Sequence, residues 1–316
     1  MKFLLSFLVL SSALLASAAD WPARVFAPYM YIGAGDNFKL TECDDACGQK
    51  YYTISFIIAD KQNEPAWDGR FPLEQNFYAD QINAIRKRGG DVIVSLGGQG
   101  GQELAIVETN LVALESKYQS VIDRYKLTWL DFDVEGESLF KQDANKRRNA
   151  VLAKLQAKNP GLMISYTLPV DPDGFTRGTK ELLADAKAKG VRVHSGNFMI
   201  MWFGPKFTSG KKMIDVCIAS ALKAHEQCRA IDPTILIGLT ALIGKNDQIS
   251  EEIFTQDDAK ALKEWADGQP WVCSLSSWAS NRDTGKPGRK RTGNTATGVP
   301  QQPWEFTRIF KPFTTK

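Results

Sequence analysis

Histidine and cysteine are scarce in this chain of 316 residues, which holds 2 histidines and 5 cysteines. His194 and His225 lie far apart and neither belongs to a ligand motif, so a Ser-His-Asp or Cys-His catalytic centre is not expected. No cysteine spacing typical of zinc occurs, and we predict no metal and no cofactor. Charge of one sign is also lacking. The 39 basic and 36 acidic residues leave a net charge of +3, which is too balanced for a nucleic-acid partner.

The only long apolar run of the chain lies at its N-terminus. Lys2 precedes a largely apolar stretch at residues 3–15, and small residues follow at 16–18. This is the layout of a secretory signal peptide. A membrane anchor is the alternative, but the run is short for the roughly 30 Å of bilayer hydrocarbon and no basic residues follow it. We therefore predict a signal peptide over residues 1–18, secretion of residues 19–316 to the extracellular space, and no membrane association.

Disulfides form in secreted proteins, which makes the cysteines of interest. Their odd number leaves at least one of them unpaired. Cys43 and Cys47 fall in a polar stretch that we expect to be a loop, where they could form a small disulfide. Cys217 and Cys228 fall in one helical pattern, about 16 Å apart along the axis at 1.5 Å per residue, which is too far for a bond.

Strand and helix patterns alternate along the chain. Eight apolar, β-branched runs predict strands at residues 24–32, 51–59, 91–96, 128–135, 163–169, 192–201, 235–240 and 271–278. Helical patterns lie at 74–88, 102–125, 143–158, 179–189, 211–230, 255–266 and 303–310. This alternation predicts an α/β protein, a single-domain (β/α)8 TIM barrel. A doubly wound open sheet is the alternative, although no glycine-rich phosphate motif follows the first strand.

Every second residue of the predicted strand at 128–135 is tryptophan or a carboxylic acid: Trp129, Asp131, Asp133 and Glu135. Residues two apart share one face of a strand, so three carboxyls would form a column inside the barrel. Carboxyls so close cannot all ionise, and we expect Glu135 to be protonated near neutral pH. Glu135 also lies at the C-terminal end of its strand, where barrel active sites lie. A structural ladder or a metal site is the alternative, but a metal site needs carboxylates from several strands.

The pattern Asp131-x-Asp133-x-Glu135 resembles the signature of glycoside hydrolase family 18, the chitinases. The stretch Ser95-Leu96-Gly97-Gly98 resembles the Ser-x-Gly-Gly motif of the same family, and Ser95 could hydrogen-bond a carboxylate on the next strand. Supporting stretches lie at residues 26–29, 165–169, 243–247 and 277–283. The resemblance covers residues 19–316 and is closest to a bacterial-type subgroup of chitinase catalytic domains.

The resemblance implies an endo-chitinase that hydrolyses β-1,4 bonds of chitin or chito-oligosaccharides by a retaining, substrate-assisted mechanism. Glu135 would act as general acid and then base, Asp133 would orient the acetamido group of the substrate, and Asp131 would share a proton deeper in the column. The expected substrate-binding residues are Trp278, Met199, Met201, Trp202, Tyr29, Ser95, Gly97 and Gly98, with Trp67 in an outer subsite. The protein is expected to act as a monomer, and its short connections favour an open cleft and endo cleavage.

The predicted strand at 192–201 departs from the family pattern at its end. Met199 and Met201 match, but Trp202 and Phe203 stand where related chitinases carry aspartate and tyrosine, which hydrogen-bond the sugar. A hydrogen bond lost in a dry site costs on the order of 1–3 kcal/mol. That corresponds to a loss of roughly tenfold to hundredfold in rate. Trp202 could instead add a stacking surface, and a chitin-binding protein with weak or no turnover is therefore the alternative function.

Overall fold

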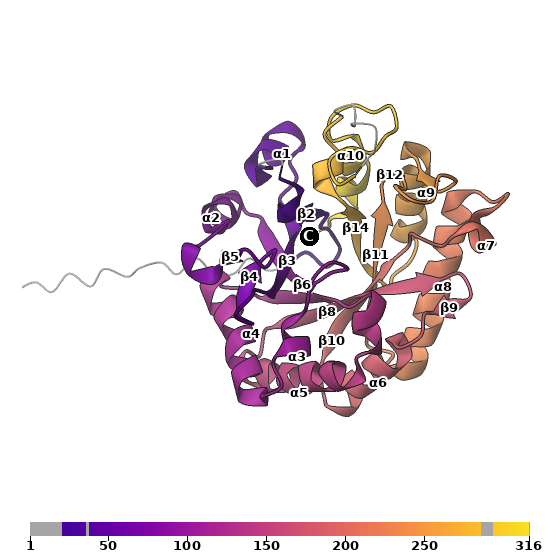
Figure 1. Cartoon of the computed structure of the whole chain (residues 1–316). Helices are drawn as coiled ribbons and strands as arrows, with labels where there is room; N and C mark the ends of the chain where they lie inside the picture. The colour runs from indigo at the N-terminus through magenta and orange to yellow at the C-terminus, as the bar shows by residue number, and fades with distance from the viewer. Residues whose placement is uncertain (1–20, 36–37, 286–292, 316) are drawn as a thin grey trace, which may run out of the picture.

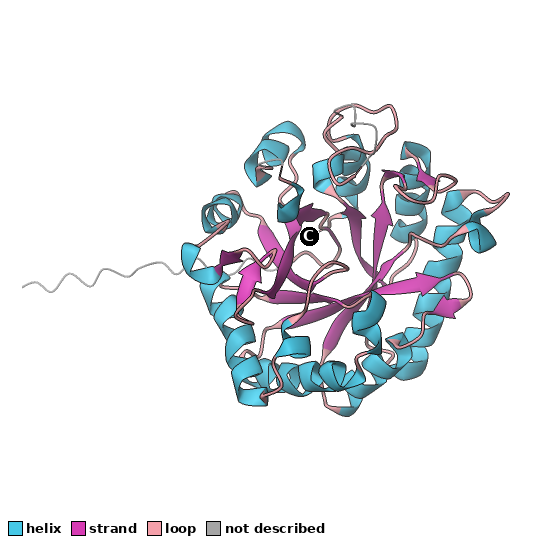
Figure 2. Ribbon diagram, in the orientation of Figure 1, coloured by secondary structure: helices cyan, strands magenta, loops and turns pink. Residues whose placement is uncertain are grey.

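The computed structural model describes residues 21–35, 38–285 and 293–315. The predicted signal peptide at residues 1–18 lies outside the described residues. A ring of parallel strands forms the centre, and helices surround it (Figure 1, Figure 2). The prediction of a (β/α)8 TIM barrel is confirmed.

Each strand of the ring corresponds to a predicted one. In chain order the long strands are β3 (Tyr51–Ala59), β6 (Asp91–Gly97), β7 (Trp129–Asp133), β8 (Met163–Asp171), β10 (Val193–Met199), β11 (Leu236–Leu242) and β14 (Val272–Trp278). The first predicted strand is divided into β1 (Val25–Phe26) and β2 (Tyr29–Tyr31). Because β1 pairs with β14 and β2 pairs with β3, these two short strands close the ring.

Small antiparallel additions extend the loops at the C-terminal ends of the ring strands. β4 (Pro65–Trp67) and β5 (Phe71–Pro72) follow β3, and β9 (Gly174–Phe175) pairs with β8. β12 (Gly244–Lys245) and β13 (Ile253–Phe254) form a hairpin after β11. These hairpins add polar loops to the end of the barrel that carries Glu135.

The helices cover the outside of the ring. They are α2 (Ala79–Lys87), α4 (Leu111–Tyr125), α5 (Gln142–Lys158), α6 (Thr179–Ala188), α8 (Met213–Ile231), α9 (Gln256–Asp267) and α10 (Glu305–Phe310), with single turns at α3 (Leu104–Val107) and α7 (Pro205–Thr208). The predicted helix at 102–125 is divided because Glu103 and Asn110 each cap a new helix start. No helix in the described part of the chain has the length and apolar character needed to span a membrane.

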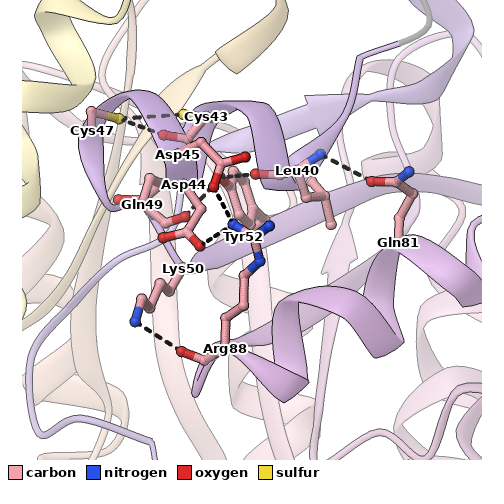
Figure 3. Close-up of polar contacts among 10 residues, drawn as sticks. All are labelled: Leu40, Cys43, Asp44, Asp45, Cys47, Gln49, Lys50, Tyr52, Gln81 and Arg88. Carbon is pink, nitrogen blue, oxygen red and sulfur yellow. Dashed lines mark hydrogen bonds and ion pairs between the residues drawn. The ribbon is translucent and has the colours of Figure 1, made fainter.

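One further helix, α1 (Leu40–Cys47), corrects the expectation of a polar loop around Cys43 and Cys47 (Figure 3). The two cysteines lie one helical turn apart with their Sγ atoms at 3.5 Å, and both are free thiols. Gly48 ends the helix in a left-handed conformation with φ of 72°. The helix has few apolar residues, so its hydrophobic pattern is weak. Cys217 and Cys228 both lie in α8, as predicted.

The apolar core lies between the ring and the helices. Leu130, Phe132 and Val134 are fully buried in it, as the alternation along β7 predicts. Inside the ring, the N-terminal end is closed by a separate apolar cluster that contains Trp129, whose ring centroid lies 5.0 Å from that of Trp21. The column of carboxyls begins directly above this apolar floor, at Asp131.

Candidate active site

A cavity of about 780 Å³ opens at the C-terminal ends of the ring strands. Its lining draws on every ring strand or the residues that follow it, and includes Tyr29, Tyr31, Phe56, Asp133, Glu135, Thr167, Met199, Met201, Trp202, Phe203, Thr240 and Trp278. These residues are far apart in the sequence and meet only because the barrel closes. The cavity therefore lies at the end of the barrel where the sequence predicted a site.

Asp131 forms the lowest level of the carboxyl column and is held by four hydroxyl groups. Ser95 donates to its Oδ2 at 2.7 Å and Ser165 to its Oδ1 at 2.6 Å. Both serines stand directly opposite Asp131 in the parallel register of β6 and β8. Tyr29 and Thr167 complete the set at 3.0 and 2.9 Å. Burial raises the pKa of Asp131 and these donors lower it, so the hydrogen bonds favour a fixed carboxylate.

Asp133 forms the middle level and has no such support. It is buried, and its Oδ1 has no hydrogen-bond partner. Burial, together with the charges of Glu135 and Asp131, raises the pKa of Asp133 well above its usual range. A buried oxygen without a partner costs free energy, so a ligand that supplies a donor here would recover it.

Gly97 explains how the backbone of Asp133 is accommodated. A Cβ atom at Gly97 would lie 2.2 Å from the carbonyl oxygen of Asp133, and the φ of Gly97 is 106°. The next residue, Gly98, donates its N–H to the same carbonyl at 3.0 Å. The glycine pair therefore permits the close approach of β6 to the end of β7.

Glu135 forms the top level, just beyond the end of β7. Its backbone is extended, with φ of −136° and ψ of 172°, so the two-residue alternation continues past Asp133. The side chain lines the cavity, and burial raises its pKa to about 7, while the backbone N–H of Gln99 lowers it. The raised pKa fits the expectation of a protonated acid near neutral pH, but its main cause is burial rather than repulsion within the column.

Trp278 ends β14 and forms an aromatic wall of the cavity with residues from β2 and β3. Its ring stacks on Phe56 with 5.7 Å between centroids and an interplanar angle of 17°. Tyr29 and Tyr31 pack against it at 5.6 and 5.5 Å. Sequence reasoning named Tyr29 and Trp278 but missed Tyr31, at the end of β2, and Phe56, within β3, because neither belongs to a charged motif. Such a wall suits the apolar face of a sugar ring.

The end of β10 supplies another wall of the cavity. Met199, Met201 and Trp202 line the cavity, and the Trp202 side chain is exposed at 41% of its surface. Phe203 is mostly buried and also borders the cavity. The two residues that depart from the family pattern are therefore both at the site, and they make this wall less polar.

Three predicted substrate-binding residues do not line the cavity. The prediction that Trp67 binds substrate in an outer subsite is wrong. Trp67 is fully buried because β4 folds back against β3, and its Nε1 donates to the Tyr125 hydroxyl at 2.7 Å. Ser95 is fully buried and holds Asp131, which confirms the predicted hydrogen bond to a carboxylate on the next strand. Gly98 makes room for the Phe56 ring, which would lie 2.7 Å from a Cβ atom. Ser95 and Gly98 therefore contribute to the site indirectly, through Asp131 and Phe56 respectively.

Loops contribute polar residues that the sequence analysis did not identify. Asp171 and Thr176 border the cavity beside β9, and Asp247 and Gln248 border it from the loop between β12 and β13. Burial raises the pKa of Asp171, and the nearby Asp173 adds to the rise. Among the residues that the structure describes, no group of three or more His, Cys, Asp or Glu is arranged to hold a metal ion.

The chain is similar to two curated proteins, although no family model matches it. A probable bifunctional chitinase/lysozyme of Escherichia coli is 29% identical over 93% of this chain, and Endochitinase 11 of Metarhizium anisopliae is 30% identical over 83%. The chain spans only 35% and 53% of the lengths of these two relatives.

The chain is also similar to solved structures, and the similarity covers nearly the whole length of a chitinase catalytic domain. The catalytic domain of a hyperthermophilic chitinase from Pyrococcus furiosus is 31% identical, with a TM-score of 0.81. The match covers 94% of this chain and 96% of that chain. Active-site mutants of the same chitinase in complex with chito-oligosaccharides superpose with a TM-score of 0.83. Together with the barrel and the carboxyl column, this similarity establishes that the chain belongs to glycoside hydrolase family 18, the chitinases.

Proposed function

We propose that this protein is a secreted endo-chitinase that hydrolyses β-1,4 bonds of chitin or chito-oligosaccharides. The observation that carries the proposal is the pairing of two unlike carboxyls in one cavity. Asp133 has a buried oxygen without a partner, and burial raises the pKa of Glu135 to about 7. Asp133 can therefore accept a hydrogen bond from a ligand, and Glu135 can donate a proton near neutral pH.

The proposed reaction retains the configuration of the anomeric carbon and uses a nucleophile of the substrate. Glu135 protonates the glycosidic oxygen as the bond to the anomeric carbon breaks. The acetamido oxygen of the same sugar attacks that carbon and forms an oxazolinium ion. Glu135 then removes a proton from the water that opens this ion. No second carboxylate is needed as nucleophile, because family 18 is an exception to the two-carboxylate scheme.

Asp133 orients the nucleophile in this proposal. Its free Oδ1 accepts a hydrogen bond from the acetamido N–H, which aims the acetamido oxygen at the anomeric carbon and stabilises the positive charge that develops. Asp131 stays below it, fixed by Ser95, Ser165, Thr167 and Tyr29. Its negative charge raises the pKa of Asp133 and thereby favours proton sharing within the column.

Substrate binding is assigned to the two walls of the cavity. The indole of Trp278, backed by Phe56, offers a flat surface to one face of the sugar that is cleaved. Met199 and Met201 border the cavity at the end of β10. The hairpins that surround the cavity are short, which supports an open cleft and endo action. Secretion rests on the signal-peptide pattern at residues 1–18.

The β10 wall supports a second candidate, a chitin-binding protein with little turnover. Trp202 and Phe203 put aromatic rings where polar side chains are usual, so groups that would bind the sugar through hydrogen bonds are absent. The complete column at Asp131, Asp133 and Glu135 favours the enzyme.

One experiment separates the two candidates. Chitopentaose is incubated with residues 19–316, with Glu135→Gln and with the control Glu137→Gln, which changes an exposed carboxylate two residues further on. The enzyme predicts product from the unchanged protein and from the control, and almost none from Glu135→Gln. If all three bind the sugar and none releases product, the protein is a binding protein instead.

A further inference from the structure

The segment after β10 holds Trp202 in a backbone conformation that bulky residues rarely adopt. The φ angle of Trp202 is 62°, and that of Gly204 is 78°. A left-handed conformation costs a non-glycine residue free energy. The Trp202 side chain is also exposed at 41% beside the cavity, so burial of the ring does not account for its position. Another group must stabilise this turn.

That group is the carboxylate of Glu252, which is buried to within 2% of its surface. Its Oε1 accepts the N–H of Gly204 at 2.7 Å, and its Oε2 accepts the N–H of Trp202 at 3.0 Å. Oε2 also accepts a hydrogen bond from Nδ2 of Asn246 at 3.0 Å. The two oxygens of one carboxyl group therefore accept the N–H groups at both ends of the turn and hold them.

Glu252 is itself fixed by the loop between β12 and β13. Asn246 donates its backbone N–H to the Glu252 carbonyl at 2.9 Å. The side-chain oxygen of Asn246 accepts the N–H groups of Gln248 and Ile249 at 3.0 and 3.2 Å. The same loop brings Asp247 and Gln248 to the cavity. One carboxylate therefore joins two segments that border the site.

We propose that Glu252 is a positioning residue that holds the Trp202 indole as a platform for one sugar ring of a chito-oligosaccharide. This inference rests on the proposed function. Trp202 stands where related chitinases carry a polar group, and an indole recognises the apolar face of an N-acetylglucosamine ring by stacking instead. Glu252 reaches no reacting atom in this account and acts only through the turn at Trp202.

A double-mutant cycle tests whether Glu252 acts through Trp202. Glu252→Gln preserves the size of the side chain but replaces one acceptor oxygen with an N–H₂ group, which cannot accept from a backbone N–H. Trp202→Ala removes the platform. We expect each single variant to raise the KM for chitopentaose about tenfold with a smaller change in kcat. The double variant should be no worse than Trp202→Ala, because the effects of coupled residues do not add.

Asp258→Asn is the matched control. Asp258 is also a carboxylate that accepts a backbone N–H, that of Thr255 at 2.8 Å, but it caps α9 and does not line the cavity. It should lower the melting temperature and leave KM unchanged. A purely structural role of Glu252 would give the same pattern in Glu252→Gln and would overturn the inference. So would a double variant whose two effects on KM multiply.

Failure of the proposed function leads to a different result. If the unchanged protein binds chitopentaose but does not cleave it, the same cycle is measured in Kd, with the same expected coupling. The role of Glu252 in holding Trp202 is then tested by sugar binding alone, without any hydrolysis. If the unchanged protein neither cleaves nor binds chitopentaose, the proposed function and the inference both fail.

Discussion

Two strand ends, those of β7 and β10, deliver side chains to the same cavity by different physical means. The carboxyls after β7 are placed by the alternation of a regular strand, and Asp131 is held by serines directly opposite it on β6 and β8. Trp202 lies beyond the end of β10 and is held by Glu252, 50 residues further along the chain. The first arrangement can be read from local sequence, and the second depends on a contact between loops.

The difference matters because the two ends carry different parts of the proposed activity. The β7 end supplies the proton and the charge, and its residues agree with the family pattern. The β10 end borders the cavity, and two of its residues, Trp202 and Phe203, depart from that pattern. We therefore expect changes at β7 to cause the largest changes in kcat, and changes at β10 to affect substrate preference and KM together with a smaller change in kcat.

After the loss of Glu135, the largest effect is expected at Asp133. Asp133→Asn removes the charge that stabilises the oxazolinium ion, so kcat should fall roughly 10²- to 10³-fold with little change in KM. Steady-state kinetics with chitopentaose measure both. An equal rise in KM with kcat preserved would mean that Asp133 contributes only to ground-state binding.

The next effect is expected from the departing pair at β10. Trp202→Asp combined with Phe203→Tyr restores the polar groups of related chitinases and should raise turnover about tenfold, by analogy with a hydrogen bond regained in a dry site. The comparison is made on kcat for chitopentaose. Unchanged or lower turnover would show that Trp202 and Phe203 serve substrate binding at least as well as the polar pair of related chitinases.

The pH profile tests the state of Glu135. Burial raises its pKa to about 7, so the acid is protonated below that pH and ionised above it. As general acid it must carry the proton, and kcat/KM should therefore fall about tenfold per pH unit above roughly pH 7. A profile that stays flat to pH 9 would contradict this assignment.

The smallest effect is expected at Trp67. Trp67→Phe removes the hydrogen bond to Tyr125 inside the core and should lower the free energy of unfolding by about 1 kcal/mol. Because Trp67 is fully buried, KM and kcat should not change. A rise in KM with unchanged stability would restore Trp67 to the substrate site.

Sequence patterns predicted the eight ring strands and the carboxyl column because both follow from short periods and local spacing. They missed α1, whose helix has little apolar surface, and placed Trp67 at the surface although β4 folds it inward. They predicted the hydrogen bond of Ser95 to a carboxylate on the next strand, which is confirmed because the register of β6 and β7 sets Ser95 opposite Asp131, but they also counted Ser95 as a substrate-binding residue although it does not line the cavity. Phe56 and Glu252 escaped notice because their roles arise only when distant segments meet.

The central claim is that the anomeric carbon undergoes two displacements, the first by the acetamido oxygen of the substrate and only the second by water. The most direct test is the configuration of the new reducing end, observed by proton NMR in the first minutes of chitopentaose hydrolysis, before the anomers equilibrate. Two inversions at one carbon predict the β-anomer as the first product. The α-anomer as the first product would contradict the mechanism, because it requires direct attack by water.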